Sequence, residues 1–431
     1  MQSIILIILI TIFGILVVKN FIKDLNSVLS LSTGFLVGLG LFTFELFVTS
    51  WLGVRITNYS VWISIISMLA IVLVTSFFRN QGINFTKYKL SKYEILGLSI
   101  ISLILLLSFT MSVYYPITAW DALALYDFRA KIIASTGYFV QISANYNYFS
   151  HYPIHTSLIH TIIYLTSNLN PQFVYSIYLF SFSAIFYSFL KERTKANVAF
   201  FATLVLVTIP EIFEHSTLAY TNLPYTVLYV SGMIYLFFGF LKNDDGHLVI
   251  SSLLVALSTW VRSDLPFWLT GILFALYYSF KNKRIKPFLF YLIPFALIQQ
   301  TWNRFASTLY GNGYSTSGQL SEASMSLLKN LDLVRLFEIS NYIYINVIST
   351  WGALLILFVI CAIVNILKNR NNTLIFLAII IVNMLGLFVG TYVFSFKVVE
   401  WKEIADSAAR MAMFFPPMMI FYSSMVISDN T

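Results

Sequence analysis

Charged residues and cysteine are scarce in this chain. Only 10% of its 431 residues are charged, whereas 58% are hydrophobic, which excludes a water-soluble globular protein. The mean hydropathy of +0.81 likewise indicates a polytopic membrane protein. Cys361 is the single cysteine. An intramolecular disulfide and a cysteine metal site are therefore excluded, and its apolar neighbours favour a buried hydrophobic role.

The basic residues are distributed in a way that argues against nucleic-acid binding. They outnumber the acidic ones by 26 to 18, giving a net charge of +8, but they fall in short clusters between apolar runs. No basic and aromatic patch of useful size lies outside those runs. The excess of positive charge is therefore better explained by membrane topology, because cytoplasmic loops carry more Lys and Arg than external loops do.

Apolar runs of membrane-spanning character recur along the whole sequence, and basic loops alternate with base-poor loops. We expect an all-α polytopic protein of the cell membrane with about thirteen spans, the N-terminus outside and the C-terminus in the cytoplasm. The first run has no positive segment before it and no cleavage site, so it is expected to be retained. The expected spans are Met1–Val18, Leu29–Trp51, Tyr59–Phe78, Tyr93–Val113, Gln172–Leu190, Asn197–Ile209, Leu223–Leu241, Leu248–Val261, Phe267–Phe280, Phe288–Trp302, Tyr342–Leu367, Leu374–Phe396 and Met411–Ile427.

Two external segments interrupt this series. The loop at 114–170 contains His151–Ser167, which is too short and too polar for a comfortable span, so we expect an interfacial or re-entrant helix. The loop at 303–341 is expected to be irregular in its Gly-Ser-Thr-rich first half and helical on the membrane surface in its second half. A polar loop is expected at Pro210–Asn222. The three spans within 1–78 are expected to form an extra N-terminal module ahead of the main membrane domain at 79–431.

The segment Tyr114–Lys131, YYPITAWDALALYDFRAK, places a carboxylate at the membrane surface. Two tyrosines end the preceding span, so Asp121 is expected at the outer water interface beside the interfacial anchor Trp120. Capping of the helix that begins here is the ordinary explanation for such an acid. However, the residues three and four positions later are apolar and provide no base to neutralise it. We therefore interpret Asp121 as a functional carboxylate.

Two further charged residues, Asp127 and Arg410, could form ordinary ion pairs or take part in function. Asp127 precedes Lys131 by four residues, the orientation favoured in a surface ion pair, which indicates a structural role. Arg410 begins the last span on the external side, where the positive-inside rule disfavours bases. Its guanidinium suits a bidentate grip on a phosphate, and an ion pair with Asp406 or Glu403 is an equal alternative. We expect Asp121 and Arg410 to meet in a wet pocket at the outer face, with the carboxylate otherwise unneutralised.

The segment that opens with FSHYP contains histidines that could form hydrogen bonds or bind a metal. His151 and His155 are four residues apart, which permits a two-histidine metal face, but no carboxylate lies nearby in the sequence. We therefore favour hydrogen bonds from His151, Tyr152 and His155 to headgroup or sugar oxygens. His160 lies five residues further on and does not share their face.

Polar residues elsewhere suggest a second wall of the same site. Glu211 and His215 are four residues apart in the second external loop, and Asn222 begins the following span; a simple solvated loop is the alternative. Arg262 and Asp264 lie at a turn between two apolar runs, where a mutual pair is the simplest way to accommodate their charges.

Four segments together resemble membrane glycosyltransferases of the GT-C superfamily, in particular bacterial and archaeal relatives of protein mannosyltransferases and aminoarabinose transferases. WDALALYDFRAK resembles the first external loop of that superfamily, where an acid acts as catalytic base, and HYPIHTSLIH resembles the helix that follows it. TIPEIFEHSTLAYTNLPY stands in the place of the second external motif. The Val261–Pro266 turn and SAARMAMFFPP resemble the later arginine-containing stretches. Asn222 stands where relatives often carry an acid, which makes a divalent metal doubtful, so no cofactor is expected.

The resemblance implies inverting transfer of a sugar from a polyprenyl-phosphate donor to a hydroxyl of a glycan, lipid or protein acceptor, a hexosyltransferase type of reaction. Asp121 would deprotonate the acceptor, and Arg410, assisted by Lys131 or Arg129, would hold the departing phosphate. The aromatic residues Trp120, Tyr126 and Tyr152 would pack on the sugar or the prenyl chain.

Two other classes of protein remain as alternatives. A transporter or flippase of lipid-linked sugars would also need many spans and external bases, but it would require no general base and would show charges at the bilayer midplane. A polymerase or ligase of surface polysaccharide could use the 303–341 segment as an acceptor platform. The concentration of polar residues in external loops favours the transferase.

Overall fold

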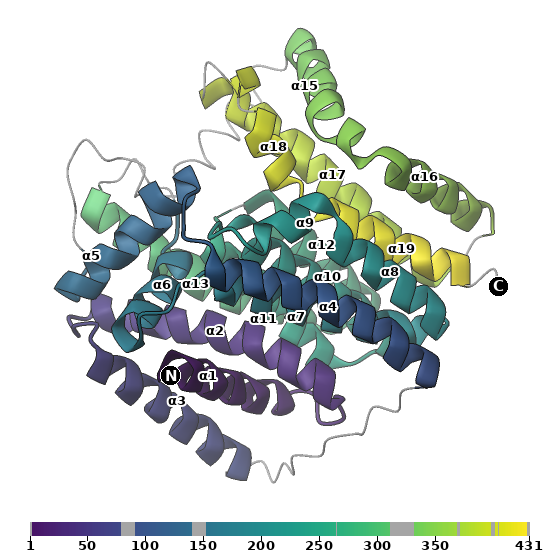
Figure 1. Ribbon diagram of the computed structural model, residues 1–431. Helices are drawn as coiled ribbons and strands as arrows, with labels where there is room; N and C mark the ends of the chain where they lie inside the picture. Colours follow the sequence, from purple (N-terminus) through teal and green to yellow (C-terminus); the bar gives the residue numbers. More distant parts are fainter. Residues whose placement is uncertain are drawn as a thin grey trace.

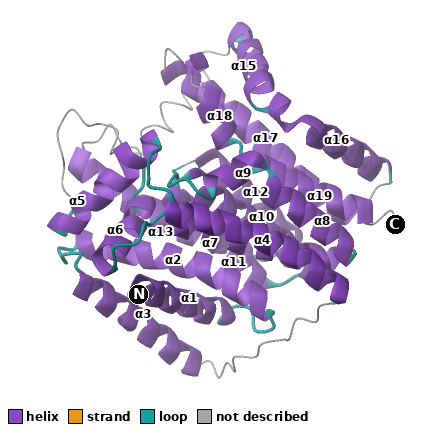
Figure 2. Cartoon of the chain, in the orientation of Figure 1, coloured by secondary structure: helices purple, strands orange, loops and turns teal. Residues whose placement is uncertain are grey.

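The computed structural model describes residues 2–78, 91–139, 152–263, 265–310, 332–368, 371–397, 401–403 and 405–428. All regular structure in these ranges is helical, as Figure 2 shows. Eight helices are long and apolar enough to cross a membrane, which agrees with the expected α-helical polytopic class; the count of about thirteen spans stays a prediction. The eight are Gln2–Lys19, Ser27–Trp51, Asn58–Phe78, Glu94–Tyr114, Phe173–Arg193, Asn222–Lys242, Leu333–Leu367 and Asn372–Phe396.

The described helices form a single bundle (Figure 1). In the first half they are α1 Gln2–Lys19, α2 Ser27–Trp51, α3 Asn58–Phe78, α4 Lys92–Tyr114, a π-helix Ala122–Asp127, α5 Phe128–Thr136, α6 His155–Thr166, α7 Phe173–Arg193, α8 Ala196–Thr208 and α9 Pro210–His215. In the second half they are α10 Asn222–Lys242, α11 Asp245–Val261, α12 Leu265–Lys281, α13 Lys286–Tyr310, α15 Leu333–Asn346, a 3₁₀ turn Ile348–Trp351, α16 Gly352–Leu367, α17 Asn371–Lys397, a 3₁₀ turn Trp401–Glu403, α18 Ala405–Met411 and α19 Phe415–Ser428.

Basic side chains collect at one end of the bundle, where they tie helix termini together. Three ion pairs join helix ends there: Glu94 with Lys191, Glu192 with Lys242 (2.7 Å) and Asp245 with Arg284 (2.7 Å). Because these pairs lie at the starts of α4 and α11 and at the ends of α7 and α10, the other termini of the same helices must lie at the opposite end. That opposite end holds the candidate site.

The first two helices are packed into the core. A Cβ atom at Gly14 of α1 would lie 1.8 Å from the carbonyl oxygen of Gly34 in α2, so only glycine permits this close approach. Thr43 of α2 hydrogen-bonds His155 of α6 (2.7 Å) and accepts a bond from Trp260 of α11 (3.2 Å). A boundary near residue 78 stays a prediction, but α2 shares its polar contacts with the helices on the other side of that boundary.

The segment expected to form an interfacial or re-entrant helix is buried within the bundle. Ten of the twelve residues of α6 are buried, including His155 and His160, and α6 lies against α2 and α5 at the left of Figure 1. Both histidines use both ring nitrogens in contacts with side chains of neighbouring elements, which is one way to accommodate polar groups in an apolar bundle. The position of α6 relative to the membrane stays a prediction.

Two expected loops are partly helical. The Pro210–Asn222 loop contains α9, and the expected irregular start of the 303–341 segment is helical as far as Tyr310; residues 311–331 lie outside the described residues. The span expected at Tyr342–Leu367 lies within the candidate span Leu333–Leu367, whose helix is interrupted between α15 and α16, where Gly352 has a φ of 49°. Glycine tolerates this positive φ, and hydropathy alone does not reveal such a break.

Candidate functional site

Asp121 stands at the start of a π-helix, which continues directly into α5. Its side chain makes no capping hydrogen bond, so capping does not explain the acid. In a π-helix the repeat is wider than in an α-helix, with bonds from residue i to i+5. Residues five apart, such as Asp121 and Tyr126, are therefore brought toward the same face, where an α-helix would turn them apart.

Arg410 is the polar partner of Asp121 in the described part of the chain. Nη1 of Arg410 donates to Oδ2 of Asp121 over 3.0 Å, although 289 positions separate the two residues. The side chains remain 34% exposed for Asp121 and 19% exposed for Arg410. The two groups therefore meet as expected and Arg410 neutralises the carboxylate, while their location at the outer face stays a prediction. The side chain of Asp406 lies outside the described residues.

The segment between α9 and α10 contacts Arg410. Nδ2 of Asn222 donates to the Arg410 carbonyl oxygen over 3.2 Å, which ties the start of α10 to the end of α18. The guanidinium carbon of Arg410 lies 5.4 Å from the ring centre of Tyr220, within the range of a cation–π interaction. These contacts hold Arg410 beside Asp121.

His215 lies near Arg410 and Tyr220. It is 4% exposed, and its Nδ1 atom has no hydrogen-bond partner within the described residues. Its ring lies 5.6 Å from that of Tyr220. Burial, reinforced by the guanidinium groups of Arg410 and Arg262, lowers the pKa of His215 to about 3. The imidazole is therefore neutral at physiological pH and can serve as a hydrogen-bonding group, not as a third cation.

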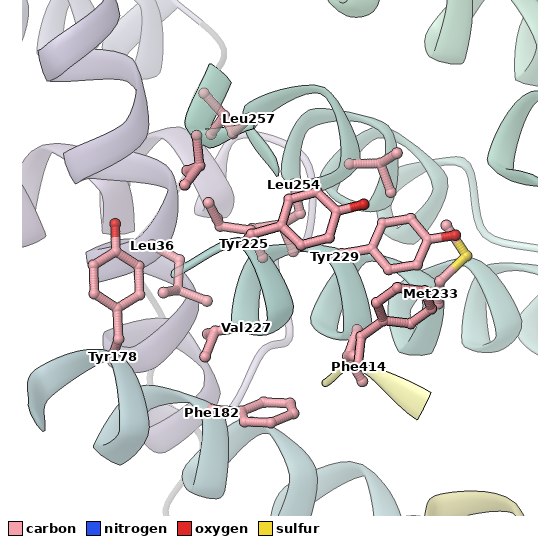
Figure 3. Close-up of a cluster of buried hydrophobic side chains, with 14 of the residues drawn as sticks. Leu36, Tyr178, Phe182, Tyr225, Val227, Tyr229, Met233, Leu254, Leu257 and Phe414 are labelled. Atoms are coloured by element: carbon pink, nitrogen blue, oxygen red, sulfur yellow. The ribbon is translucent and has the colours of Figure 1, made fainter. Parts of the chain in front are cut away.

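Arg262 lies at the end of α11 over an aromatic floor. It is 8% exposed, and its guanidinium carbon is 5.9 Å from the Tyr225 ring centre. The rings of Tyr225 and Tyr229 stack one helical turn apart at 5.8 Å and an angle of 3°, and Figure 3 shows them side by side above Phe414. The partner expected for Arg262, Asp264, lies outside the described residues.

A third arginine, Arg129, lies in α5. Nη1 of Arg129 donates to the Tyr152 carbonyl oxygen over 3.0 Å, and the Tyr126 hydroxyl shares a 3.2 Å hydrogen bond with Thr221. Burial and Tyr152 raise the pKa of Tyr126, while the positive charges of Arg262 and Arg129 act in the opposite direction. Both guanidinium groups therefore lie within electrostatic reach of Tyr126.

No family model, curated protein or solved structure matches this chain. At the end of the bundle opposite to the basic end, Asp121 contacts Arg410, and the neutral His215 lies within electrostatic reach of Arg410 and Arg262. Arg129 is connected to this group through Tyr126, which lies within electrostatic reach of both Arg129 and Arg262. Such a cluster can bind a phosphate and place a proton acceptor beside it.

The other expected site residues differ in what they can offer to a substrate. His155 is fully buried and uses both ring nitrogens, with Thr43 at 2.7 Å and Tyr178 at 2.9 Å, so it offers no ring nitrogen to a substrate. Trp120 is 77% exposed, and Glu211 is half-buried on α9. His151 lies outside the described residues. No group of three or more potential metal ligands occurs among the described residues.

The ion pair of Asp127 and Lys131 forms as expected, at 2.8 Å, but its surface location was wrong. Asp127 is 1% exposed and also bonds His160 and Tyr164. The ammonium group of Lys131 is held by this acid, which makes Lys131 a weaker candidate for phosphate than Arg129. Sequence spacing shows which residues share a helix face, but it does not show which element covers that face.

The sequence analysis did not identify the tyrosines whose rings lie against the guanidinium groups of Arg410 and Arg262. Tyr220 and Tyr225 belong to the stretch LAYTNLPY, and the hydroxyl of Thr221, which lies between them, shares a hydrogen bond with the Tyr126 hydroxyl. The signal available was the occurrence of two tyrosines on either side of the start of an expected span. Such tyrosines usually mark a membrane interface, which is why their role beneath two guanidinium groups was missed.

Proposed function

We propose that this chain is an integral membrane glycosyltransferase of the GT-C type, which transfers a sugar from a polyprenyl-phosphate donor to an acceptor hydroxyl. The observation that carries the proposal is the partly exposed pair of Asp121 and Arg410, 3.0 Å apart at one end of a membrane bundle. Sugar transfer from a lipid phosphate requires a proton acceptor for the attacking hydroxyl and a cation for the departing oxygen. This pair supplies both groups at one place.

In the proposed reaction Asp121 takes the proton of the acceptor hydroxyl while the acceptor oxygen bonds to the anomeric carbon. The bond from that carbon to the phosphate oxygen breaks, and its electron pair leaves with the lipid phosphate. Attack from the side opposite to the leaving group inverts the anomeric configuration, so the bound sugar must lie between Asp121 and Arg410 and separate the pair that they form without substrate. Arg410, assisted by Arg129 and Arg262, stabilises the charge that develops on the phosphate, and the neutral His215 provides a hydrogen bond to it.

We further propose that the site faces the outside of the cell. The opposite end of the bundle carries clustered bases at the ends of α7, α10 and α12, and clustered bases favour the cytoplasmic side. If the π-helix, α5, α6, α9, α15 and α18 stay at the external end, the remaining helices give about thirteen crossings. This arrangement places the N-terminus outside and the C-terminus inside, in agreement with the opposite ends at which Figure 1 marks them.

The orientation is testable by thiol labelling, because the one native cysteine is buried. Ser135 of α5 and Lys281 of α12 are both exposed, at opposite ends of the bundle. We expect Ser135→Cys to react with a membrane-impermeant maleimide in intact cells. Lys281→Cys should react only after the membrane has been permeabilised. Labelling of Lys281→Cys in intact cells, with Ser135→Cys protected, would reverse the proposed topology.

The proposed activity is tested with the protein reconstituted into liposomes that contain polyprenyl-phosphate donors with labelled sugars. We expect label to pass from the lipid to an added glycan, lipid or protein acceptor, with one lipid phosphate released for each sugar transferred. Movement of intact labelled lipid across the bilayer without transfer would instead identify a flippase. Mass analysis of lipid-linked intermediates in a deletion strain would identify the sugar, and growth of a repeating polymer would favour the polymerase or ligase.

A further inference from the structure

A buried chain of polar side chains lies behind the π-helix. Nζ of Lys131 contacts Asp127 at 2.8 Å, Oδ1 of Asp127 contacts Nδ1 of His160 at 3.1 Å, and Nε2 of His160 contacts the Tyr175 hydroxyl at 3.1 Å. The hydroxyl of Tyr164 also donates to Asp127. The proposed reaction uses none of these contacts, yet they link the π-helix and α5 to α6 and α7.

The interior residues of this hydrogen-bonded series are deeply buried. Asp127 and Tyr175 are each 1% exposed, and His160 is 0% exposed. Burial alone would raise the pKa of Asp127, but hydrogen bonds from His160, Lys131 and Tyr164 outweigh it and lower the pKa to about 2. Asp127 is thus a permanent anionic anchor. A buried charge held by several partners is costly to disturb, because removal of one partner leaves the charge uncompensated.

Tyr175, at the far end of this hydrogen-bonded series, contacts residues next to the candidate site. Tyr175 packs in one small cluster with Ala122 and Ala219. Ala122 directly follows Asp121, and Ala219 directly precedes Tyr220, whose ring lies beneath the Arg410 guanidinium. The same tyrosine therefore contacts the residue next to the carboxylate and the residue next to the support of the guanidinium.

We propose that Asp127 and His160 are positioning residues, which hold the π-helix and Tyr175 so that Asp121 meets Arg410. The π-helix needs such a support, because its bonds are less favourable than those of an α-helix and it usually persists only where its surroundings enforce it. Asp127 is the last residue of this π-helix and Asp121 its cap, so an anchor at one end fixes the angle of the other. The effect on sugar transfer rests on the proposed function, but the positioning itself does not.

The chain contains a matched control for this proposal. His155 and His160 both belong to α6, both are fully buried, and each donates to or accepts from a tyrosine of α7. His155 reaches Thr43 of α2, whereas His160 reaches Asp127. Loss of either imidazole removes a similar amount of buried packing, but only His160 connects to the π-helix.

The experiment uses a cysteine pair as a reporter of position. In the Asp121→Cys, Arg410→Cys double variant, the rate of cross-linking by a short bismaleimide is measured with His160→Gln or with His155→Gln added. We expect His160→Gln to slow cross-linking several-fold and His155→Gln to leave it unchanged. The proposal would be overturned if cross-linking proceeded at the same rate with His160→Gln as with His155→Gln, whether both variants slow it or neither does. If His160→Gln fails to accumulate in the membrane, Asp127→Asn, which keeps the size of the side chain, decides the question in the same way.

A second measurement separates this proposal from the proposed function. With Asp121 and Arg410 intact, His160→Gln should lower the kcat of sugar transfer about a hundredfold, the loss expected from displacement of a catalytic group by about 1 Å, while the KM for the donor stays unchanged. His155→Gln should retain the wild-type kcat. Absence of transfer in the wild-type protein would refute the proposed function alone, since cross-linking needs no turnover. Equal losses of kcat in both histidine variants would overturn the positioning role.

Discussion

Replacement of Asp121 by asparagine is expected to lower sugar transfer by about 10²–10⁴-fold, the contribution that a general base usually makes. Asparagine keeps the size of the side chain and an oxygen that can accept the hydrogen bond from Arg410, which spans 3.0 Å in the native protein. It loses the ability to take a proton. Expression, membrane insertion and donor binding should therefore stay close to wild type, and the loss should appear in kcat.

The chain supplies a matched control for this substitution. Asp245 pairs with Arg284 at 2.7 Å, and its side chain is 36% exposed, similar to the 34% of Asp121, but this pair lies at the opposite end of the bundle. Asp245→Asn should leave transfer unchanged. A variant Asp121→Asn that retains wild-type kcat would remove Asp121 from the mechanism, and equal losses in both variants would indicate a general effect on folding.

Replacement of Arg410 by lysine is expected to lower transfer by about 10²-fold, even though the positive charge is retained. A lysine ammonium has no planar fork, so it cannot bind a phosphate through two parallel hydrogen bonds. It also loses the stacking on Tyr220, which lies 5.4 Å from the guanidinium carbon. Because the departing phosphate gains charge only as the sugar leaves, the loss should fall mainly on kcat, by about the amount that one oxyanion donor contributes.

Arg410→Gln extends this test and separates two roles of the arginine. Removal of the charge should lower transfer further than Arg410→Lys does. If Asp121 and Arg410 act as a unit, the double variant Asp121→Asn, Arg410→Gln should be little worse than the more damaging single variant, because the effects of cooperating groups are not additive. Arg284→Lys at the opposite end is the control and should leave transfer unchanged. Full activity in Arg410→Lys would show that the charge alone suffices, which contradicts a bidentate grip.

The sequence was sufficient to predict the fold class because the physics involved is local. An apolar run such as Leu29–Trp51 must be helical in a membrane, since no water is present to satisfy its backbone. The structure places α2 at Ser27–Trp51, close to that prediction. The break between α15 and α16 was missed because the residues on both sides are apolar, and hydropathy does not respond to a local change of backbone direction.

The candidate site was predictable only in its chemistry. Asp121 has no base three or four residues later, which favoured a distant partner, whereas Arg410 had Asp406 and Glu403 as equal local alternatives. The sequence therefore allowed the pairing of Asp121 with Arg410 but did not require it, and no residue pattern in ALALYD predicts the π-helix that begins beside Asp121. The burial of Asp127 was missed for a related reason. Its i+4 partner Lys131 satisfied the local rule, and the cover provided by α6 is a property of the tertiary fold.

The central claim, that Asp121 and Arg410 form one site, is tested most directly by cross-linking in native membranes. Because Cys361 is buried, the double variant Asp121→Cys, Arg410→Cys presents two reactive thiols that a short bismaleimide can bridge, and each single variant serves as a control. We predict a rapid intramolecular cross-link in the double variant only. Failure of the double variant to cross-link, with both single variants reacting normally with the reagent, would contradict the account.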